Sequence, residues 1–473
     1  MTGDPARTRI VREYPGWTSA EPFLSGSFAP VFREVEADDL PVVAGKIPED
    51  VSGTYLRNGS NPLFKPMSYT WPFDGDGMIH AVQLDNGRAR YRNRFVQTRG
   101  LTVEHRAGRA VYGGVMRPVP VDPSLVGPDG EPGPVKNGAF VNVIRHAGRV
   151  LALGEASPAY EMTADLETLG EWRPGTDEPI QIGAHNRRHP RTGDLFGLTY
   201  FIDQPRVRFQ RIDAGGRLSD SFEIGLAVPT MIHDFVLTER HIVLLTGPLV
   251  IDIPAAMRGL SPLQWRPELG TRICVLGQDG SSPLWLEAEP YFVFHFANGF
   301  EEKGRIVLDY VRHSGLGAMV GQPADGVPPR LHRMAIDLTA RRIEDAAVAD
   351  LGVEFPRADD RLEARVTRYV VAPTRAGSGA GSFNAIARLD THSGAVALHE
   401  FGSRLAGEAV VVPRPGGADE ADGWLAVFVY DPATDGSDFV LLDARDPAAE
   451  PVAVVRLPQR VPQGLHGNWL PKA

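Results

Sequence analysis

The sequence predicts an all-β protein, with a β-propeller as the preferred architecture. Short runs rich in β-branched and aromatic residues recur almost to the end of the 473-residue chain, and Gly, Asp, Asn or Pro bounds them. Long helical periodicity is scarce. A chain with so many strands must protect the edges of its sheets, and a closed ring of four-stranded blades does so. A pair of sandwich domains is the alternative, because no sharp repeat such as a WD pattern is visible.

The individual elements follow from the local sequence. Residues 1–30, punctuated by Pro and Gly, predict an irregular N-terminal lead, and residues 31–473 predict a single β-propeller domain. The best helical candidate is SPLQWRPELG (261–270), which is short and broken by prolines. Residues 424–431 and 438–444 predict a hairpin with a longer loop. The predicted strands lie within residues 89–98, 148–155, 193–201, 241–253, 304–313, 394–402, 424–431 and 438–444.

Composition narrows the class of protein. The net charge is −10, and no Lys/Arg-rich run is present, which argues against nucleic acid as the main partner. The single cysteine, Cys274, excludes an intrachain disulfide framework and a thiolate metal cluster. The first residues have no apolar stretch typical of a secretory signal, and no run of about 18 apolar residues occurs. We therefore expect a cytoplasmic protein and leave peripheral membrane contact open.

Histidines give the first indication of a site. His185, His233, His295 and His466 lie in apolar, strand-like or glycine-flanked surroundings. The first three are spaced by 48 and 62 residues, roughly one propeller blade of about 40–50 residues. Histidines at the same depth on several blades would point toward the axis of the ring, where imidazole suits iron, copper or zinc. A single histidine on an apolar strand is more often a satisfied core residue, so spacing does not select these four over others such as His189, His241, His313 and His399.

Four histidine motifs and an N-terminal signature together resemble a known family. GTYLRNGSNPLF (53–64), FDGDGMIHAV (73–82) and ARYRNRFVQT resemble the opening of the carotenoid cleavage oxygenases, which include lignostilbene dioxygenase-like and retinoid isomerase members. AHNRRHPRTGDLF, MIHDFVLT, FHFANGFEE and GLHGNWLP look like the four ligand motifs in the family's order. The resemblance implies a seven-bladed propeller with one Fe(II) on its axis, with loops and short helices capping the active site. The implied iron ligands are His185, His233, His295 and His466.

The resemblance also explains an unusual C-terminus. Chain ends normally fray, yet GLHGNWLPKA carries a histidine beside two apolar anchors, Trp469 and Leu470. The family reading implies that this tail returns to the centre of the ring and supplies the fourth ligand. Gly464 and Gly467 would let the backbone approach closely there.

Three glutamates are expected behind the metal ligands. Metal-bound imidazoles usually donate their other N–H to a carboxylate or carbonyl. The family pattern uses glutamates for this, and they match Glu155, Glu354 and Glu408. A lone glutamate is more often a solvated surface charge, but each of these lies beside strand-forming residues. We expect all three to be buried and ionised, with His233, His295 and His466 as recipients, which leaves His185 without a carboxylate partner.

The resemblance implies oxidative cleavage of an alkene. Four neutral imidazoles leave two positions on an octahedral ferrous ion, one of which can hold O2. We expect O2 as co-substrate, addition across a C=C bond of a conjugated substrate, and two carbonyl products. No external reductant and no organic cofactor is needed, because the alkene supplies the electrons. The mechanism could pass through a dioxetane or an epoxide.

The sequence favours a carotenoid or apocarotenoid over a stilbenoid. The branch that cleaves stilbenes and phenylpropenes tends to carry a lysine just before the glutamate that corresponds to Glu155. Here that position is Gly154. A long polyene needs an apolar tunnel. An apolar patch around its mouth would admit a lipophilic substrate from a lipid phase. Core packing is the more frequent role of any one aromatic residue, but the candidates for lining the tunnel are Phe64, Trp71, Phe73, Phe294 and Phe296.

Other readings remain open, and three residues depart from the family pattern. Ser60 and Ala409 stand where proline is usual, and AHNRRHP replaces an AHPK-type sequence, although no iron ligand is lost. The main alternative is the same cleavage of a stilbenoid or phenylpropenoid. A propeller that only binds a ligand or protein, and a retinoid isomerase that makes no use of O2, are less favoured. No obligate protein partner is implied.

Overall fold

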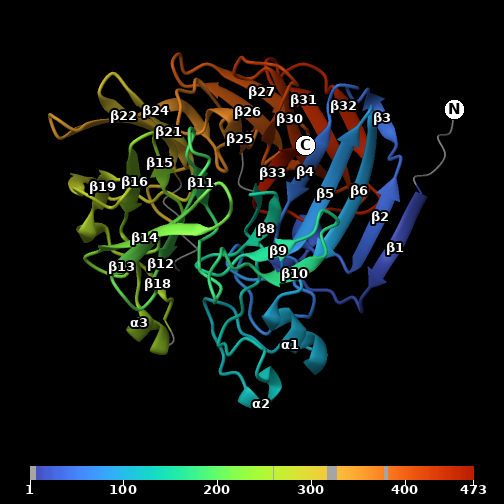
Figure 1. Ribbon diagram of the computed structural model, residues 1–473. Helices are drawn as coiled ribbons and strands as arrows, with labels where there is room; N and C mark the ends of the chain where they lie inside the picture. Colours follow the sequence, from blue (N-terminus) through green and yellow to red (C-terminus); the bar gives the residue numbers. More distant parts are fainter. Residues whose placement is uncertain (1–6, 259, 317–326, 378–381, 473) are drawn as a thin grey trace. The chain divides into compact units, whose positions relative to one another are not determined.

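The chain divides into two compact units. The computed structural model describes residues 7–258, 260–316, 327–377 and 382–472. Unit 1 comprises Met1–Trp172, Arg375–Ile386 and Ala397–Ala473, and unit 2 comprises Arg173–Thr374 and Ala387–Val396. Strands dominate both units (Figure 1). Whether the two units make the single catalytic domain expected over residues 31–473 stays a prediction.

Unit 1 contains three antiparallel sheets. Their strand orders are β1-β2-β6-β5-β4-β33, β10-β9-β8-β7 and β28-β30-β31-β32-β3, with β29 also paired to β30. The bounds in the first sheet are β1 (Arg7–Glu13), β2 (Arg33–Asp38), β4 (Gly53–Arg57), β5 (Met78–Asp85), β6 (Arg88–Phe95) and β33 (Gly467–Pro471). Those in the second are β7 (Asn142–His146), β8 (Arg149–Leu153), β9 (Tyr160–Met162) and β10 (Thr168–Glu171). Those in the third are β3 (Val42–Gly45), β28 (Leu405–Ala406), β29 (Val410–Pro413), β30 (Gly423–Asp431), β31 (Gly436–Asp443) and β32 (Ala453–Arg456).

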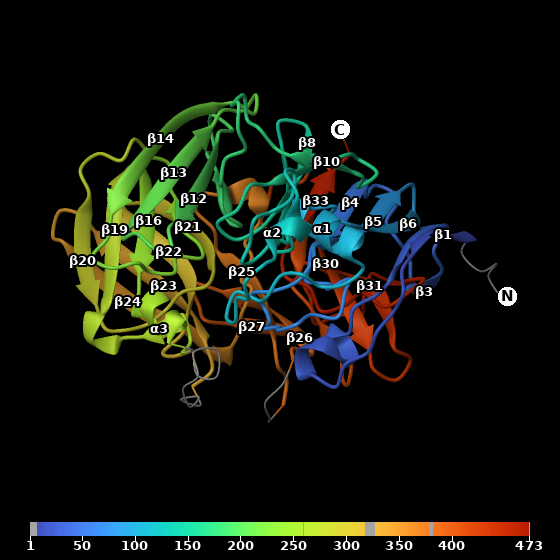
Figure 2. The ribbon, with the colours of Figure 1, turned by 90° about the horizontal axis from the view of Figure 1, so that it is seen from below.

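The described residues of unit 2 form three four-stranded antiparallel sheets and one two-stranded ribbon. The strand order of the first sheet is β11-β12-β13-β14, and Figure 2 shows β12, β13 and β14 as neighbouring strands. It is followed by β15-β16-β19-β20 with the ribbon β17-β18, and then by β21-β22-β23-β24. The bounds are β11 (Asn186–Arg188), β12 (Leu195–Tyr200), β13 (Arg206–Ile212), β14 (Leu218–Gly225), β15 (Val236–Leu237), β16 (His241–Thr246), β17 (Leu249–Ile251), β18 (Leu263–Trp265), β19 (Thr271–Gly277), β20 (Leu284–Ala288), β21 (Phe296–Glu302), β22 (Arg305–Arg312), β23 (Arg330–Asp337) and β24 (Arg342–Gly352).

Three further strands, β25, β26 and β27, form a sheet that comes between β24 and β28 along the chain. β25 (Tyr369–Thr374) belongs to unit 2, and the division between the units falls within β26 (Ala385–Asp390) and β27 (Val396–Glu400). All eight predicted strand segments contain observed strands, so the all-β prediction is confirmed. The hairpin prediction is also confirmed, because β30 pairs with β31 from Trp424↔Asp443 to Asp431↔Gly436.

The two ends of the chain each complete a sheet formed by the opposite end. The C-terminal strand β33 pairs with β4, with Trp469 opposite Tyr55. The early strand β3 pairs with β32, with Val42 opposite Val455. Both pairings lie within unit 1, and they protect strand edges that would otherwise be open. Closing sheets in this way ties the residues just before β33 to the N-terminal part of the chain.

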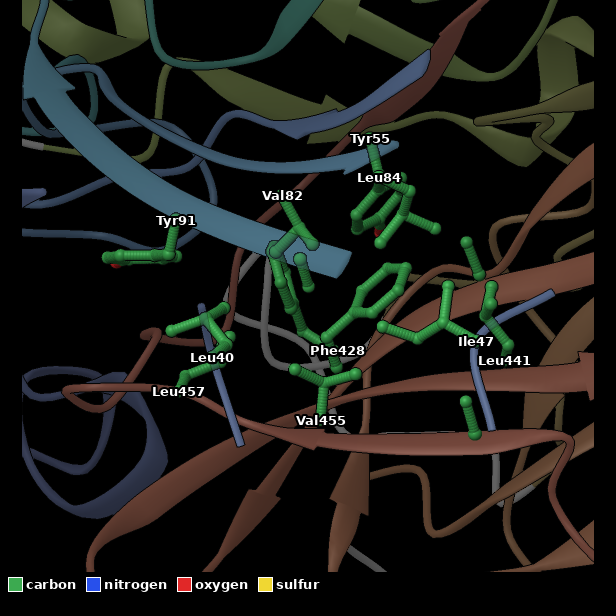
Figure 3. Packing of buried hydrophobic residues seen from close by; sticks show 14 of the residues in the cluster. Leu40, Ile47, Tyr55, Val82, Leu84, Tyr91, Phe428, Leu441, Val455 and Leu457 are labelled. Atoms are coloured by element: carbon green, nitrogen blue, oxygen red, sulfur yellow. The ribbon is translucent and has the colours of Figure 1, made fainter. Parts of the chain in front are cut away.

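The core of unit 1 packs the first and third sheets together. Its buried side chains come from β4 and β5 on one side, such as Tyr55 and Val82, and from β30 and β31 on the other, such as Phe428 and Leu441 (Figure 3). β30 is buried over eight consecutive residues, as expected of a central strand that is covered on both faces. This core also holds Trp469, so packing fixes the C-terminal strand.

Helices are short, and one prediction about them was wrong. SPLQWRPELG forms strand β18 and the 3-10 turn η3 (Pro267–Leu269), because Pro267 at the start of the turn prevents a continuous helix. α1 begins after the N-cap Thr98, whose side chain accepts from Leu101 N, and ends at Gly108 with φ 66°. The helices and turns are η1 (Pro22–Leu24), η2 (Gly26–Phe28), α1 (Arg99–Ala107), α2 (Pro123–Val126), α3 (Ile253–Met257), η3 and η5 (Asp360–Leu362). In the described ranges, no helix has the length and apolar character needed to cross a membrane.

The N-terminal lead is not irregular throughout. Residues Arg7–Glu13 form β1, which pairs with β2 through a register that shifts between Ile10 and Arg12. Ion pairs with β2 stabilise this exposed edge strand. Arg9 pairs with Glu36, and Arg12 donates to the buried Glu34 at 2.8 Å. The rest of the lead contains the turns η1 and η2 and no strand within the described residues.

Candidate metal centre

Three of the predicted ligands lie together in unit 2. His185 directly precedes β11, His295 directly precedes β21, and His233 lies three residues before β15. Each of these strands is the first strand of its own four-stranded sheet and lies at one edge of it. The three histidines therefore occupy equivalent places on successive sheets. This repetition is the reason for their spacing of about one sheet along the sequence.

The imidazole nitrogens of these three residues converge. The Nε2 atoms of His185 and His233 are 3.1 Å apart, and the ring of His295 lies 5.2 Å from each of the other two. One ligand nitrogen from each lies within 4.8 Å of the others. Two nitrogens at right angles, each about 2.1 Å from a metal, would be about 3.0 Å apart. The donor set and its spacing therefore fit a transition-metal ion.

Glu354 orients the imidazole of His295. Its Oε2 accepts from His295 Nδ1 at 2.5 Å, which leaves Nε2 as the metal-facing nitrogen. Its Oε1 accepts from His313 Nε2 at 2.9 Å. Burial alone would raise the pKa of Glu354, but the charges and hydrogen bonds of His295 and His313 hold it well below its usual value. The expected pairing of Glu354 with His295 agrees with this geometry.

Two neighbours of Glu354 were not predicted to belong to the site. His313 was one of the histidines that the sequence could not assign. Phe355 stacks on the His295 ring at 5.0 Å and has a φ of 51°, which is uncommon for a non-glycine residue. Its position directly after a predicted glutamate is the only sequence signal that could have indicated it.

His466 is held from several sides within unit 1. Its Nδ1 lies 2.9 Å from Oε1 of Glu408, and the other carboxylate oxygen accepts from Gly467 N at 2.7 Å. Its backbone N–H donates to Val141 O, and its carbonyl accepts from Asn58 N. Glu408 is only 1% exposed, as expected. The imidazole therefore has a fixed orientation in which Nε2 is the available ligand atom.

Close backbone packing surrounds His466. A Cβ atom on Gly464 would lie 2.8 Å from Asn58 O, and one on Gly467 would lie 2.3 Å from Leu56 O. Both glycines are needed for the approach of the tail to β4. Trp469 is buried in the core of unit 1, which agrees with its expected role as an anchor.

Known proteins are similar to this sequence over nearly its whole length. A family model described as Retinal pigment epithelial membrane protein matches residues 28–471. A carotenoid cleavage oxygenase of Mycobacterium tuberculosis is 32% identical over 512 residues, covering 96% of this chain and 98% of that protein. The apocarotenoid-15,15'-oxygenase of Synechocystis is 31% identical over 462 residues, covering 90% and 92%.

The chain belongs to the carotenoid cleavage oxygenase family.

Solved structures of this family share the fold. The lignostilbene dioxygenase of Pseudomonas brassicacearum is 29% identical, with a TM-score of 0.89 over 97% of this chain and 100% of that chain. A cobalt-substituted apocarotenoid oxygenase of Synechocystis is 29% identical, with a TM-score of 0.82 over 92% and 96%. The predicted family and the predicted seven-bladed β-propeller are confirmed. The enzyme class, a dioxygenase of the carotenoid cleavage oxygenase family, is confirmed as well.

The other carboxylates expected in a carotenoid cleavage oxygenase differ in their surroundings. Glu155 lies in a turn that follows β8 in unit 1. The side chain was expected to be buried but is half-buried, although its Oε2 atom is fully covered. Its pairing with His233 stays a prediction. His185 was expected to lack a carboxylate partner. Asp234 Oδ2 lies 3.9 Å from His185 Nδ1, beyond hydrogen-bond distance.

The five aromatic residues proposed for a tunnel fall into different settings. Phe64 and Phe73 line a pocket of unit 1, with an empty space of about 470 Å³ that includes open solvent, but Asp76, Glu104 and Lys136 line it too. Trp71 stacks on Phe23 of η1. In unit 2, Phe294 packs edge-on against His233 at 5.7 Å, beside the candidate ligands, whereas Phe296 belongs to the buried core with Tyr310. Phe296 thus has the core role that the sequence could not exclude.

Proposed function

We propose that this carotenoid cleavage oxygenase binds one Fe(II) through His185, His233, His295 and His466 and cleaves a C=C bond of a carotenoid or apocarotenoid with O2. The observation that carries the proposal is the convergence of three imidazoles in unit 2, where two Nε2 atoms are 3.1 Å apart. His466 completes the set because Glu408 fixes its Nδ1 and leaves Nε2 for a metal. The Synechocystis relative has been solved in a cobalt-substituted form, which supports a transition-metal ion in this chain as well.

An all-imidazole set suits iron and leaves room for a co-substrate. Imidazole binds Fe, Cu and Zn well, and four such ligands leave two of six octahedral positions. Bound Fe(II) would supply the activation of O2 that addition to an alkene needs. The overall reaction balances without a reductant or an organic cofactor. The C=C and O=O bonds break, two C=O bonds form, and the alkene carbons supply the electrons.

The side chains around the ligands have separate tasks. Glu354 and Glu408 each accept a hydrogen bond from an Nδ1–H group, which fixes the tautomer and orientation of His295 and His466. We assign the same task toward His233 to Glu155. Phe294 and Phe355 pack against ligand rings and would exclude water from one side of the site. Phe294 is the aromatic residue best placed to contact a polyene.

Gly154 supports an apocarotenoid over a stilbenoid. A Cβ atom at this position would lie 2.8 Å from Oδ1 of Asn137, which already accepts from Ala139 N. The site therefore has little room for the lysine that the stilbene-cleaving branch tends to carry. The similarity to a lignostilbene dioxygenase, with a TM-score of 0.89, keeps a stilbenoid as the second candidate.

A lipophilic polyene substrate would reach the enzyme from a lipid phase, so the enzyme needs access to a membrane. We propose peripheral contact with a membrane for an enzyme that we expect in the cytoplasm. Two exposed apolar side chains, Met67 and Val115, support this surface. Val115 lines the pocket of unit 1, and so do Pro66 and Ser68, the residues on either side of Met67. Sedimentation with phosphatidylcholine vesicles tests it. Binding that is the same for wild type and a Met67→Asp, Val115→Asp double variant would refute this surface.

Product identification tests the substrate assignment. The iron-loaded enzyme is incubated in air with an apocarotenal in one tube and a hydroxystilbene in another, and the products are identified by mass spectrometry. Two shorter carbonyl compounds from the apocarotenal are the expected result. Aromatic aldehydes from the stilbene alone would establish the second candidate and show that Gly154 does not exclude a phenolic substrate.

A further inference from the structure

An arginine and an aspartate join the three histidine-bearing segments of unit 2. Asp234 directly follows His233, and Arg187 lies two residues after His185. Arg187 Nη2 donates to Asp234 Oδ2 at 2.5 Å. The same oxygen accepts from Phe296 N at 2.9 Å, in the residue directly after His295. One carboxylate thus contacts all three segments within two residues of each histidine.

The guanidinium adds two contacts to backbone carbonyls. Arg187 Nε donates to Phe235 O at 2.8 Å, and Nη2 donates to Phe296 O at 3.2 Å. Asp234 Oδ1 accepts from Phe235 N at 2.7 Å. Arg187 and Asp234 together, called the Arg187–Asp234 clamp, therefore bind both the backbone N–H and the backbone carbonyl of Phe296. A planar fork of donors is suited to such several-sided contact, and a lysine could not reproduce it.

The clamp is buried, so its two charges depend on each other. The Asp234 side chain is 1% exposed and that of Arg187 is 13% exposed. A further carboxylate oxygen, Glu363 Oε1, lies 4.0 Å from Arg187 Nη1. Removing one member of a buried ion pair leaves an uncompensated charge and strongly disturbs its surroundings. Here those surroundings are the backbone on either side of the candidate ligands.

We propose that Arg187 and Asp234 are positioning residues that set the mutual spacing of His185, His233 and His295 for one metal ion. This inference rests on the proposed metal site. Glu354 orients a single imidazole through its Nδ1, whereas the clamp fixes the main chain of all three segments. Asp234 does not act as an imidazole acceptor, since its oxygen is 3.9 Å from His185 Nδ1.

The test measures binding of Co(II) alone to the full-length metal-free chain at 25 °C. Asp234→Asn keeps the shape and an acceptor oxygen but removes the charge, and Arg187→Gln removes the fork. Each should weaken Co(II) binding by about 10- to 100-fold, the usual effect of losing a group that supports metal ligands. The visible bands of bound Co(II) should shift as well, because the ligand geometry changes. Arg187→Lys keeps only the charge, so its Co(II) affinity should lie between the affinities of wild type and Arg187→Gln.

A second buried ion pair of unit 2 supplies the matched control. Arg333 binds Asp309 through two contacts of 2.7 Å between β22 and β23, and Asp309 is fully buried. Asp309→Asn should lower the midpoint of thermal unfolding and leave the Co(II) affinity of the folded chain unchanged. The inference would be overturned if Asp234→Asn and Arg187→Gln bound Co(II) as tightly as wild type does. It would also be overturned if Asp309→Asn lost as much Co(II) affinity as these two variants. Wild type that binds no Co(II) would instead refute the proposed metal site.

Discussion

The Nδ1 atom of His466 lies 2.9 Å from Oε1 of Glu408, 58 residues earlier in the chain. The second oxygen of the same carboxylate accepts from the backbone of Gly467. One buried carboxylate therefore fixes both the ring and the main chain of a histidine that lies seven residues before the last residue of the sequence. A histidine held so firmly near a chain end is suited to bind a metal, because little conformational freedom remains to be lost.

Glu408→Gln should weaken iron binding by about 10- to 100-fold. The amide would present an NH2 group either to His466 Nδ1–H or to Gly467 N–H, so one donor would face another donor. Competition with a chromophoric chelator under anaerobic conditions measures the Fe(II) affinity. Glu450→Gln, at an exposed position, is the control and should bind iron as wild type does. Unchanged affinity in Glu408→Gln would show that the carboxylate does not support a ligand.

Gly467→Ala should lower the free energy of unfolding by about 1–3 kcal/mol, the usual cost of overpacking. The added methyl would lie 2.3 Å from Leu56 O, and a backbone atom cannot move away as a side chain can. Urea unfolding gives the free energy. Gly225→Ala is the matched control, because a Cβ atom there meets nothing within 4 Å. If both variants unfold at the same urea concentration, the close approach of the tail is not a constraint.

Acid should remove a stabilising contribution of Glu301. Burial raises the pKa of this carboxyl, but hydrogen bonds from Arg240, Thr238 and His241 outweigh burial and lower the pKa to about 2, from 4.5. Because the pKa is lower in the folded state than in the unfolded state, ionised Glu301 stabilises the fold. This contribution is fully present above pH 4.5 and is lost as the pH falls toward 2. Glu301→Gln should therefore cost roughly 2 kcal/mol at pH 7, after allowance for the exposed guanidinium.

This pH effect is measured by urea unfolding of the metal-free wild type and of Glu301→Gln between pH 7 and pH 3. The difference in the free energy of unfolding should shrink steadily below pH 5. A difference that stays constant over this range would mean that the folded and unfolded pKa values of Glu301 are alike.

Phe294 and Phe296 should respond differently to truncation. Phe296→Ala removes a buried ring from the core of unit 2 and should cost about 3–5 kcal/mol of stability. Phe294→Leu keeps most of the apolar volume beside His233 and should instead raise the KM for an apocarotenal several-fold while leaving the iron content unchanged. Steady-state kinetics and urea unfolding separate the two effects. An unaltered KM in Phe294→Leu would remove Phe294 from the substrate site.

Much of the fold could be predicted because strand signals are local. The run WLAVFVYD-PATDGS-DFVLLDA contains both strands and the turn of a hairpin, and β30 and β31 pair as expected. Helix α1 was missed although Thr98 and Gly108 supply ordinary start and stop signals, because a helix of nine residues is shorter than the window in which helical periodicity is recognised. SPLQWRPELG was misread because Pro267 begins a 3-10 turn, and only its preceding residues pair as a strand.

The site was predictable only as far as sequence motifs extend. The four histidines lie in short motifs that are recognised together, by their order along the chain, and the three glutamates follow from the same family pattern. Arg187 and Asp234 could not be recognised as partners, because they are 47 residues apart and their contact depends on three sheets being formed. His313 was considered but could not be assigned to the site for the same reason, since its partner Glu354 lies 41 residues later.

The central claim is that four histidines, including the one in the C-terminal tail, hold the iron that cleaves the substrate. The most direct test compares wild type with His466→Ala for iron bound per chain and for carbonyl products formed from an apocarotenal in air, identified by mass spectrometry. The account predicts one iron per chain and two shorter carbonyl compounds for wild type, and loss of both iron and products in a folded His466→Ala. A His466→Ala enzyme that keeps its iron and forms the same products at the same rate would contradict it.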